Sequence, residues 1–150
     1  MPKERWQVIR VELISRPGEP IDSPPGRDFL VSSRHSLLEF AVAIDTSFAR
    51  WDRGHLHLFR LSDGSLFMLG GDEDDRGVAS TESSLVGSLQ LEEGTVFEYV
   101  FDLGDEWTHR CEVRTVGVDP DEELGDIPPA PVALFGWGTI PDQYGRTMPD

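Results

Sequence analysis

Two histidines, His55 and His57, are separated by one residue within a stretch predicted to be a β-strand. Side chains at positions i and i+2 of a strand project from the same face, about 6 to 7 Å apart, which suits two ligands of one metal ion. His109, Asp102 or Asp105 would supply a third ligand if the strands that carry them were neighbours. The spacing is therefore compatible with a metal site.

The alternative is that these histidines pack in the core or in a cleft, beside aromatic residues that are close in the sequence, Trp51 and Phe59. In that case their ring nitrogens are satisfied within the protein and hold no ion. We favour this interpretation, so the sequence predicts neither a bound metal nor another cofactor.

The densest cluster of polar and aromatic residues consists of Asp102, Asp105, Trp107 and His109. Histidine titrates near neutral pH and a nearby carboxylate raises its pKa, so this cluster could support general acid-base catalysis. In the alternative interpretation, the two aspartates organise a turn by accepting hydrogen bonds from backbone amides, while Trp107 and His109 pack. We favour the structural interpretation and assign no catalytic residue.

The other motifs indicate no chemistry. Residues 72–75 are acidic but lack the repeated aspartates and distal glutamate of a calcium loop. The glycines at 70–71 are not followed by the lysine or helix start of a phosphate-binding loop, and no Gly-x-Ser-x-Gly elbow occurs. The single cysteine, Cys111, excludes an intramolecular disulfide and is expected to be an inert small hydrophobe.

Two helices are predicted. Ser36 and Glu39 form a capping box, after which apolar residues recur at helical spacing, so a helix is expected from about 37 to 48 with one face packed on a sheet. A shorter second helix is expected from about 82 to 90, although it contains Gly87.

The remaining pattern predicts strands. Residues 5–14 read as a half-buried strand and residues 28–32 as a short one. The proline-rich stretch 15–27 between them is expected to be irregular. Residues 55–61 and 65–69 flank a Ser-Asp-Gly turn and predict a hairpin.

A second strand pair, residues 95–102 and 107–118, allows its register to be predicted. Side chains alternate with period two, so the aromatic rows of the two strands share a face only if the numbers of opposed residues have an even sum. A three-residue loop, 103–105, satisfies this condition. The predicted pairs are Phe101 with Trp107, Tyr99 with His109, Phe97 with Cys111 and, on the opposite face, Glu98 with Arg110.

The chain has 150 residues, of which 38% are hydrophobic and 27% charged, which fits one domain over 1–150. The proline- and acid-rich segment 119–150 is expected to dock on that domain. No apolar run is long enough to span a membrane and the N-terminus does not resemble a signal peptide, so a cytoplasmic location is expected. A formal net charge of −15 disfavours direct binding of nucleic acid or of anionic membrane.

Two passages resemble a known family. Residues 51–59, WDRGHLHLF, are similar to a W-D-x-x-H-L-H-x-F passage of the plasmid (Ri plasmid) open-reading-frame-three-like family, whose members are also described as insertion-element passenger proteins. Residues 97–109, FEYVFDLGDEWTH, resemble the family's F-x-Y-x-Y-D-F-G-D-x-W-x-H passage, and weaker similarity spans about 8 to 145. The resemblance implies an α+β domain with a bent mixed or antiparallel β-sheet and about two helices packed on one face.

The chain also departs from that family. Residues 20–29 lack the Pro-Trp-Arg-Arg stretch that many members carry, and residues 128–144 lack the cysteine of their C-terminal segment. The resemblance therefore implies no metal role for that segment here, and it implies little about activity.

We predict a small cytoplasmic, non-enzymatic binding or interaction domain whose cleft lies between residues 51–59 and 102–109. The partner would be a protein or a small ligand, and neither nucleic acid nor membrane. A second hypothesis is a metal-dependent hydrolase-like site, and a third is an acidic decoy that occupies a nucleic-acid-binding protein. The hydrolase-like site would use His55, His57 and His109 with Asp102 or Asp105. The predicted binding residues are Trp51, His55, His57, Phe59, Asp102, Asp105, Trp107 and His109.

Overall fold

The computed structural model describes residues 4–50, 56–68 and 78–141. Two α-helices, α1 (Leu37–Ser47) and α2 (Pro120–Leu124), and one 3-10 helix, η1 (Val86–Leu89), are present in this part of the chain. Its strands are β1 (Trp6–Arg16), β2 (Glu19–Pro20), β3 (Gly26–Ser32), β4 (His57–Leu61), β5 (Leu66–Met68), β6 (Val78–Ser80), β7 (Val96–Phe101), β8 (Trp107–Val116) and β9 (Val132–Trp137).

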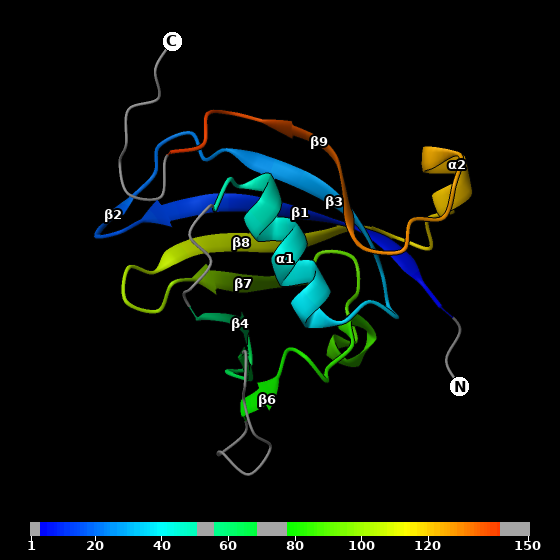
Figure 1. Ribbon diagram of the computed structural model, residues 1–150, viewed down its shortest axis with the longest axis horizontal. Coiled ribbons are helices and arrows are strands. Elements are labelled where there is room, and N and C mark those ends of the chain that lie inside the picture. The colour runs from blue at the N-terminus through cyan, green and yellow to red at the C-terminus, as the bar shows by residue number, and fades with distance from the viewer. Residues whose placement is uncertain (1–3, 51–55, 69–77, 142–150) are drawn as a thin grey trace.

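These nine strands form a single sheet in the order β6-β5-β4-β7-β8-β1-β3-β9, with β2 paired to β1. Every pair is antiparallel except β5 and β6, which are parallel. Figure 1 shows β3, β1, β8 and β7 running side by side behind α1. The α+β architecture with a mixed sheet is confirmed, but the sheet dominates. Only α1 lies across a face of the sheet, whereas α2 is a five-residue turn at its end in which Pro120 alone is buried.

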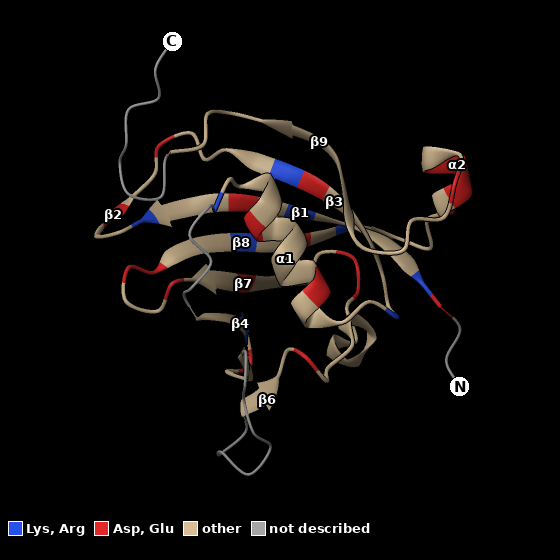
Figure 2. Ribbon diagram, viewed as in Figure 1, with Lys and Arg blue, Asp and Glu red and all other residues tan. Residues whose placement is uncertain are grey.

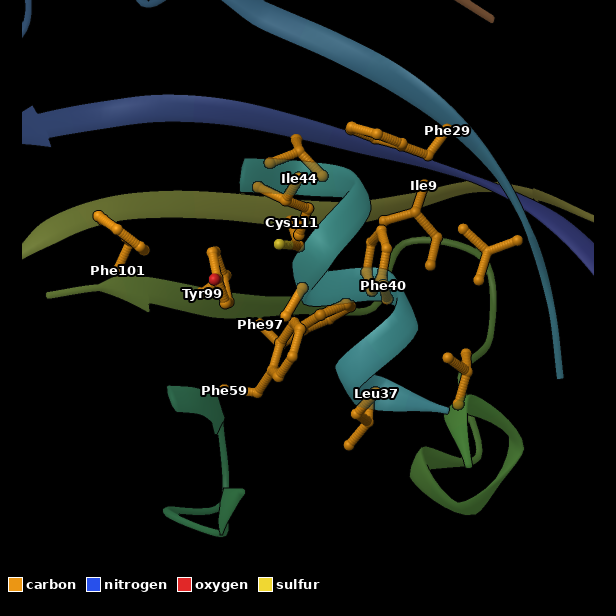
Figure 3. Packing of buried hydrophobic residues seen from close by; sticks show 14 of the residues in the cluster. Ile9, Phe29, Leu37, Phe40, Ile44, Phe59, Phe97, Tyr99, Phe101 and Cys111 are labelled. Atoms are coloured by element: carbon orange, nitrogen blue, oxygen red, sulfur yellow. The ribbon is translucent and has the colours of Figure 1, made fainter. Parts of the chain in front are cut away.

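The helix α1 begins at the predicted capping box. The Glu39 amide donates to Ser36 Oγ at 3.0 Å, and the Ser36 amide donates to a Glu39 carboxylate oxygen at 2.9 Å. Behind this cap, an apolar stripe faces the sheet and meets the inward rows of β1, β3, β4, β7 and β8 (Figure 3). The stripe consists of Leu37, Phe40, Ala41 and Ile44, continued by Phe48 at the C-cap.

The predicted register of β7 and β8 is confirmed at every position named, from Phe101 opposite Trp107 to Phe97 opposite Cys111. The aromatic rows of both strands are buried as expected. Glu98 and Arg110 do oppose each other, yet Glu98 forms its ion pair with Arg60 of β4 at 2.7 Å.

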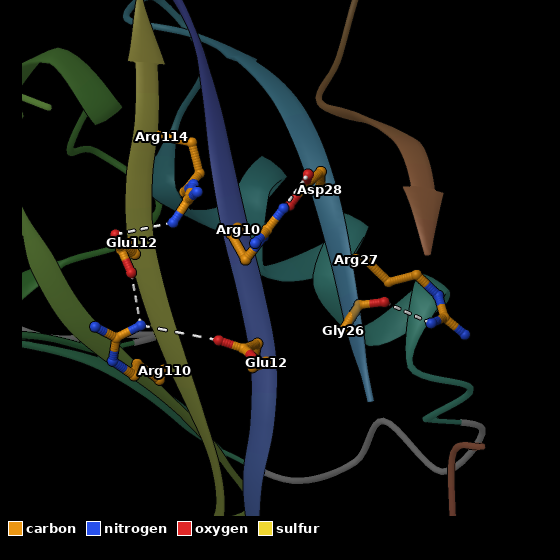
Figure 4. Close-up of polar contacts among 8 residues, drawn as sticks. All are labelled: Arg10, Glu12, Gly26, Arg27, Asp28, Arg110, Glu112 and Arg114. Atoms are coloured by element: carbon orange, nitrogen blue, oxygen red, sulfur yellow. Dashed lines mark hydrogen bonds and ion pairs between the residues drawn. The ribbon is translucent and has the colours of Figure 1, made fainter. Parts of the chain in front are cut away.

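The sheet face opposite α1 is polar. One row across β4, β7, β8 and β1 alternates in charge: Arg60, Glu98, Arg110 and Glu12. In the neighbouring row, Arg10 of β1 makes two hydrogen bonds to the Asp28 carboxylate of β3, at 2.9 and 3.1 Å. Figure 4 shows the contacts of Arg10 with Asp28 and of Arg110 with Glu12. Since opposed charges satisfy one another, this face can be exposed to water, and no helix of the described residues packs on it.

The predicted helix at 82–90 is wrong, because only the four-residue η1 forms there. Leu85 is extended and bridges to Ser36, and the Val86 and Gly87 amides donate to the carbonyls of His35 and Ser33. These backbone groups are used in pairing with a distant segment, so they cannot form helical bonds. Leu85 is exposed as a result.

The predicted irregular stretch 15–27 is more ordered than expected. β1 extends to Arg16, β2 follows after a turn at Gly18, whose φ is 80°, and β3 begins at Gly26. Towards the C-terminus, β9 pairs with β3 and forms one edge of the sheet.

Candidate functional site

The two passages that carry the family resemblance lie on adjacent strands. Phe59 of β4 opposes Tyr99 of β7, which in turn opposes His109 of β8. His57 opposes Phe101 in the same way, and Phe101 opposes Trp107. The structure thus brings together the described parts of both passages, whereas Trp51 and His55 lie outside the described residues.

Most of the predicted binding residues that the structure describes are buried. Phe59, Trp107 and His109 are in the core, and His57 and Asp102 are less than one tenth exposed. Asp105 is the exception, because it lies exposed at the tip of the β7–β8 hairpin. The described members therefore divide into an internal polar and aromatic cluster and one hairpin-tip carboxylate.

His109 is held in one tautomer. Its Nδ1 lies 3.0 Å from the Tyr99 carbonyl oxygen, and since a carbonyl only accepts, Nδ1 carries the hydrogen and Nε2 a lone pair. Burial lowers the pKa of His109 to about 3, and the nearby Arg50 cation acts in the same direction. The catalytic hypothesis required a nearby carboxylate to raise this pKa, and no carboxylate is among the groups that shift it.

His57 is also neutral. Its Nε2 lies 3.1 Å from the Thr81 hydroxyl, which is buried, and its ring packs 5.7 Å from the Tyr99 ring between centroids. Burial lowers the pKa of His57 to about 4. Neither described histidine of the cluster titrates near neutral pH, so neither exchanges protons there as a general acid or base would.

Asp102 organises the hairpin turn, as the structural interpretation predicted. Its carboxylate accepts from the amides of Gly104 at 3.0 Å and Asp105 at 3.2 Å, and its own φ is 66°. Asp105 does not share this role, because it contributes its amide as a donor.

Two buried charges beside the cluster were not predicted. Arg50 is fully buried, where Nε donates to the Phe48 carbonyl at 2.8 Å and Nη2 to the Pro141 carbonyl at 2.7 Å. The Asp45 carboxylate accepts from the Tyr99 hydroxyl at 2.8 Å. Asp45 could have been found, since it lies one residue after Ile44 and four after Ala41 on the buried stripe of α1. Arg50 gives no comparable sequence signal.

The described residues offer no metal centre. No three of their His, Cys, Asp or Glu side chains converge as ligands. The Arg50 cation that lowers the pKa of His109 would also oppose a metal cation at Nε2. Cys111 is buried in the same sheet, and burial raises the pKa of its thiol. The prediction that His55 and His57 project from one strand face falls outside the described residues, because His55 is not among them.

An open groove of about 320 Å³ lies between two hairpin tips. One wall comes from β1 and β2 and the other from the end of the β7–β8 hairpin, and Figure 2 shows acidic residues at both tips. The groove is lined by Ser15, Arg16, Gly18, Glu19, Pro20, Asp105, Glu106 and Thr108.

The fold and the cluster together define a single-sheet α+β protein with one crossing helix and a sealed polar and aromatic centre. The chain belongs to the plasmid pRiA4b ORF-3-like family, whose model matches residues 8–142. This confirms the resemblance seen in the sequence.

One solved structure with the same fold is that of a protein of unknown function, MM3350 from Methanosarcina mazei Go1. The TM-score is 0.66 at 18% sequence identity, and the match covers 89% of this chain and 70% of that one. At this identity the likeness concerns the fold alone. No curated protein matches the chain. Within the described residues, no helix is both long and apolar enough to cross a bilayer.

Proposed function

We propose that this protein is a small, single-domain, non-enzymatic binding protein of the cytoplasm, and that its groove between the two hairpin tips holds a basic segment of a protein partner. The observation that carries the proposal is the composition of the groove, in which three carboxylates, of Glu19, Asp105 and Glu106, accompany one cation, Arg16.

The carboxylates of Asp105 and Glu106 are available for a partner. Neither makes a hydrogen bond or ion pair to another side chain in the part of the chain that the structure describes. Glu19 forms an ion pair with Arg16 at 3.5 Å, but both side chains are largely exposed, so water screens this contact. A guanidinium or ammonium group entering the groove therefore meets two uncompensated negative charges.

The charge of the whole chain supports the same partner. A net charge of −15 attracts basic surfaces at long range and raises the rate of encounter with them. The groove would then supply the local contacts. The internal cluster supports binding over catalysis, because His57 and His109 are neutral and Asp102 is engaged in the turn.

The test is the binding of a fluorescent hexa-arginine peptide to the full chain, measured by anisotropy at about 50 and 150 mM salt. The groove variant combines Asp105→Asn with Glu106→Gln. The control combines Glu122→Gln with Glu123→Gln on α2, which removes the same charge from exposed acidic positions away from the groove.

We expect the groove variant to bind the peptide at least about tenfold more weakly than the parent, and the control to bind it about as well as the parent. Equal weakening in both variants would show that only net charge matters and would overturn the proposal that the groove binds the peptide.

The acidic-decoy hypothesis has a separate test. If this protein occupies a DNA-binding partner as a decoy, adding a duplex oligonucleotide to their complex should release the partner, since a decoy must compete with the nucleic acid.

A further inference from the structure

Trp107 and His109 lie on the same face of β8, two residues apart, and both are covered by the end of α1. The Phe48 ring packs edge-on against His109 with centroids 5.0 Å apart, and the Arg50 guanidinium lies 4.4 Å over the Trp107 ring. Trp107 is 2% exposed and His109 is 0% exposed. Both side chains are therefore shielded from bulk solvent.

Both side chains carry a polar atom without a partner. Trp107 Nε1 and His109 Nε2 are buried, and neither has a hydrogen-bond partner in the described residues. Native proteins rarely leave such groups unsatisfied, because a buried polar atom that loses water and gains nothing in exchange is destabilising. Side chains two positions apart on one strand face are about 6 to 7 Å from each other, so one small polar group between the two rings can reach both atoms.

The chemistry of the two atoms defines that ligand. An indole Nε1 can only donate, and His109 Nε2 can only accept, because the hydrogen of its ring is on Nδ1 and points at the Tyr99 carbonyl. An anion would meet the lone pair of Nε2, and a cation would meet the indole hydrogen and the nearby Arg50. A neutral hydroxyl group fits both, since its oxygen accepts one hydrogen bond and its hydrogen donates another.

We propose that Trp107 and His109 form an internal binding site for one hydroxyl group, which accepts from Trp107 Nε1 and donates to His109 Nε2. A water molecule or the hydroxyl of a small alcohol can supply this group. The site is separate from the groove at the hairpin tips and does not depend on the proposed function.

The test is NMR spectroscopy of the full ¹⁵N-labelled chain at pH 7. We expect the long-range ¹H–¹⁵N spectrum to show His109 protonated on Nδ1. We also expect the indole hydrogen of Trp107 to give a cross-relaxation peak at the water frequency, or to shift saturably on titration with methanol. The first result identifies water as the occupant and the second an alcohol. Absence of both, or a hydrogen on Nε2, would overturn the site.

Trp107→Phe adds an independent readout, because it removes the donor and keeps an aromatic ring. We expect the His109 Nε2 resonance to move in this variant and to stay in place in Trp6→Phe, which changes a buried tryptophan outside the site. An unmoved Nε2 resonance in folded Trp107→Phe would contradict a shared hydroxyl. If that variant does not fold, the spectra of the parent chain described above still test the proposed hydroxyl site.

Discussion

Acid should destabilise this protein through its buried histidines well before most carboxylates are protonated. His57 and His109 are neutral in the folded chain, with pKa values lowered by burial to about 4 and about 3, whereas an unfolded histidine titrates near 6.5. Below pH 6.5 these histidines therefore bind protons in the unfolded chain but not in the folded chain. Stability is complete above that pH and falls as the pH decreases towards the folded pKa values.

The magnitude follows from the linkage relation. Each such histidine changes the free energy of unfolding by about 1.4 kcal/mol per pH unit within its window. From pH 6.5 to 4.5, where the slope grows from half of this value, the loss amounts to about 2 kcal/mol for each residue and about 4 to 5 kcal/mol for the pair. A loss of this size is comparable with the whole stability of an ordinary domain, about 5 to 15 kcal/mol.

The assay is urea unfolding at several pH values between 7 and 4.5 for the parent chain and for His57→Gln. We expect the slope of unfolding free energy against pH to be about 1.4 kcal/mol per pH unit smaller in the variant. Phe59→Leu is the control, since it weakens the same packing without removing a titrating group, and it should lower the curve without changing its slope. Parallel curves for parent and His57→Gln, or a ring titration of His57 near pH 6.5, would refute the reasoning.

Four further predictions concern the core, the sheet edge and the ligands. Phe101→Ala should lower the unfolding free energy by about 3 to 5 kcal/mol, as measured by urea melts, because the ring is fully buried. Gly26→Ala should cost about 1 to 3 kcal/mol and reduce hydrogen-exchange protection of β9, because the added methyl group would meet the Trp137 indole that covers this glycine. The chain should not bind duplex DNA at about 150 mM salt in an electrophoretic or anisotropy assay, and a micromolar complex would contradict the charge argument. Protein purified without a histidine tag should hold no stoichiometric metal, in the parent or in His57→Ala, and one tight equivalent in the parent by elemental analysis would favour the hydrolase-like hypothesis.

Local and short-range patterns account for the parts of the fold that the sequence predicted. The capping box of α1 involves residues three apart, so its two hydrogen bonds follow from Ser36 and Glu39 alone. The register of β7 and β8 was predictable because a short hairpin leaves few possible pairings and the parity of the aromatic rows selects among them.

Contacts between distant segments account for the failures. Residues 82–90 have a helical apolar pattern, yet the Val86 and Gly87 amides bond to residues 33–35, which no local pattern indicates. The candidate site shows the same limit, because His57 is buried against Thr81 and His109 against Phe48, both far away in the sequence. Arg50 reaches its partner carbonyl at Pro141 across 91 positions in sequence, so its role cannot be inferred from spacing.

The internal polar contacts help to fix the register of β7 and β8, which the hydrophobic pattern alone does not determine. A slip of two residues between β7 and β8 would preserve the parity of the aromatic rows, so burial of apolar area does not exclude it. The slip would, however, move His109 away from Phe48 and Trp107 away from the Arg50 guanidinium, which pack on these two side chains from the end of α1. The Tyr99 hydroxyl bond to Asp45 then fixes β7 against α1. Because Asp105 and Glu106 are at the tip of the hairpin whose register is fixed in this way, the buried polar cluster also determines where their carboxylates stand in the groove.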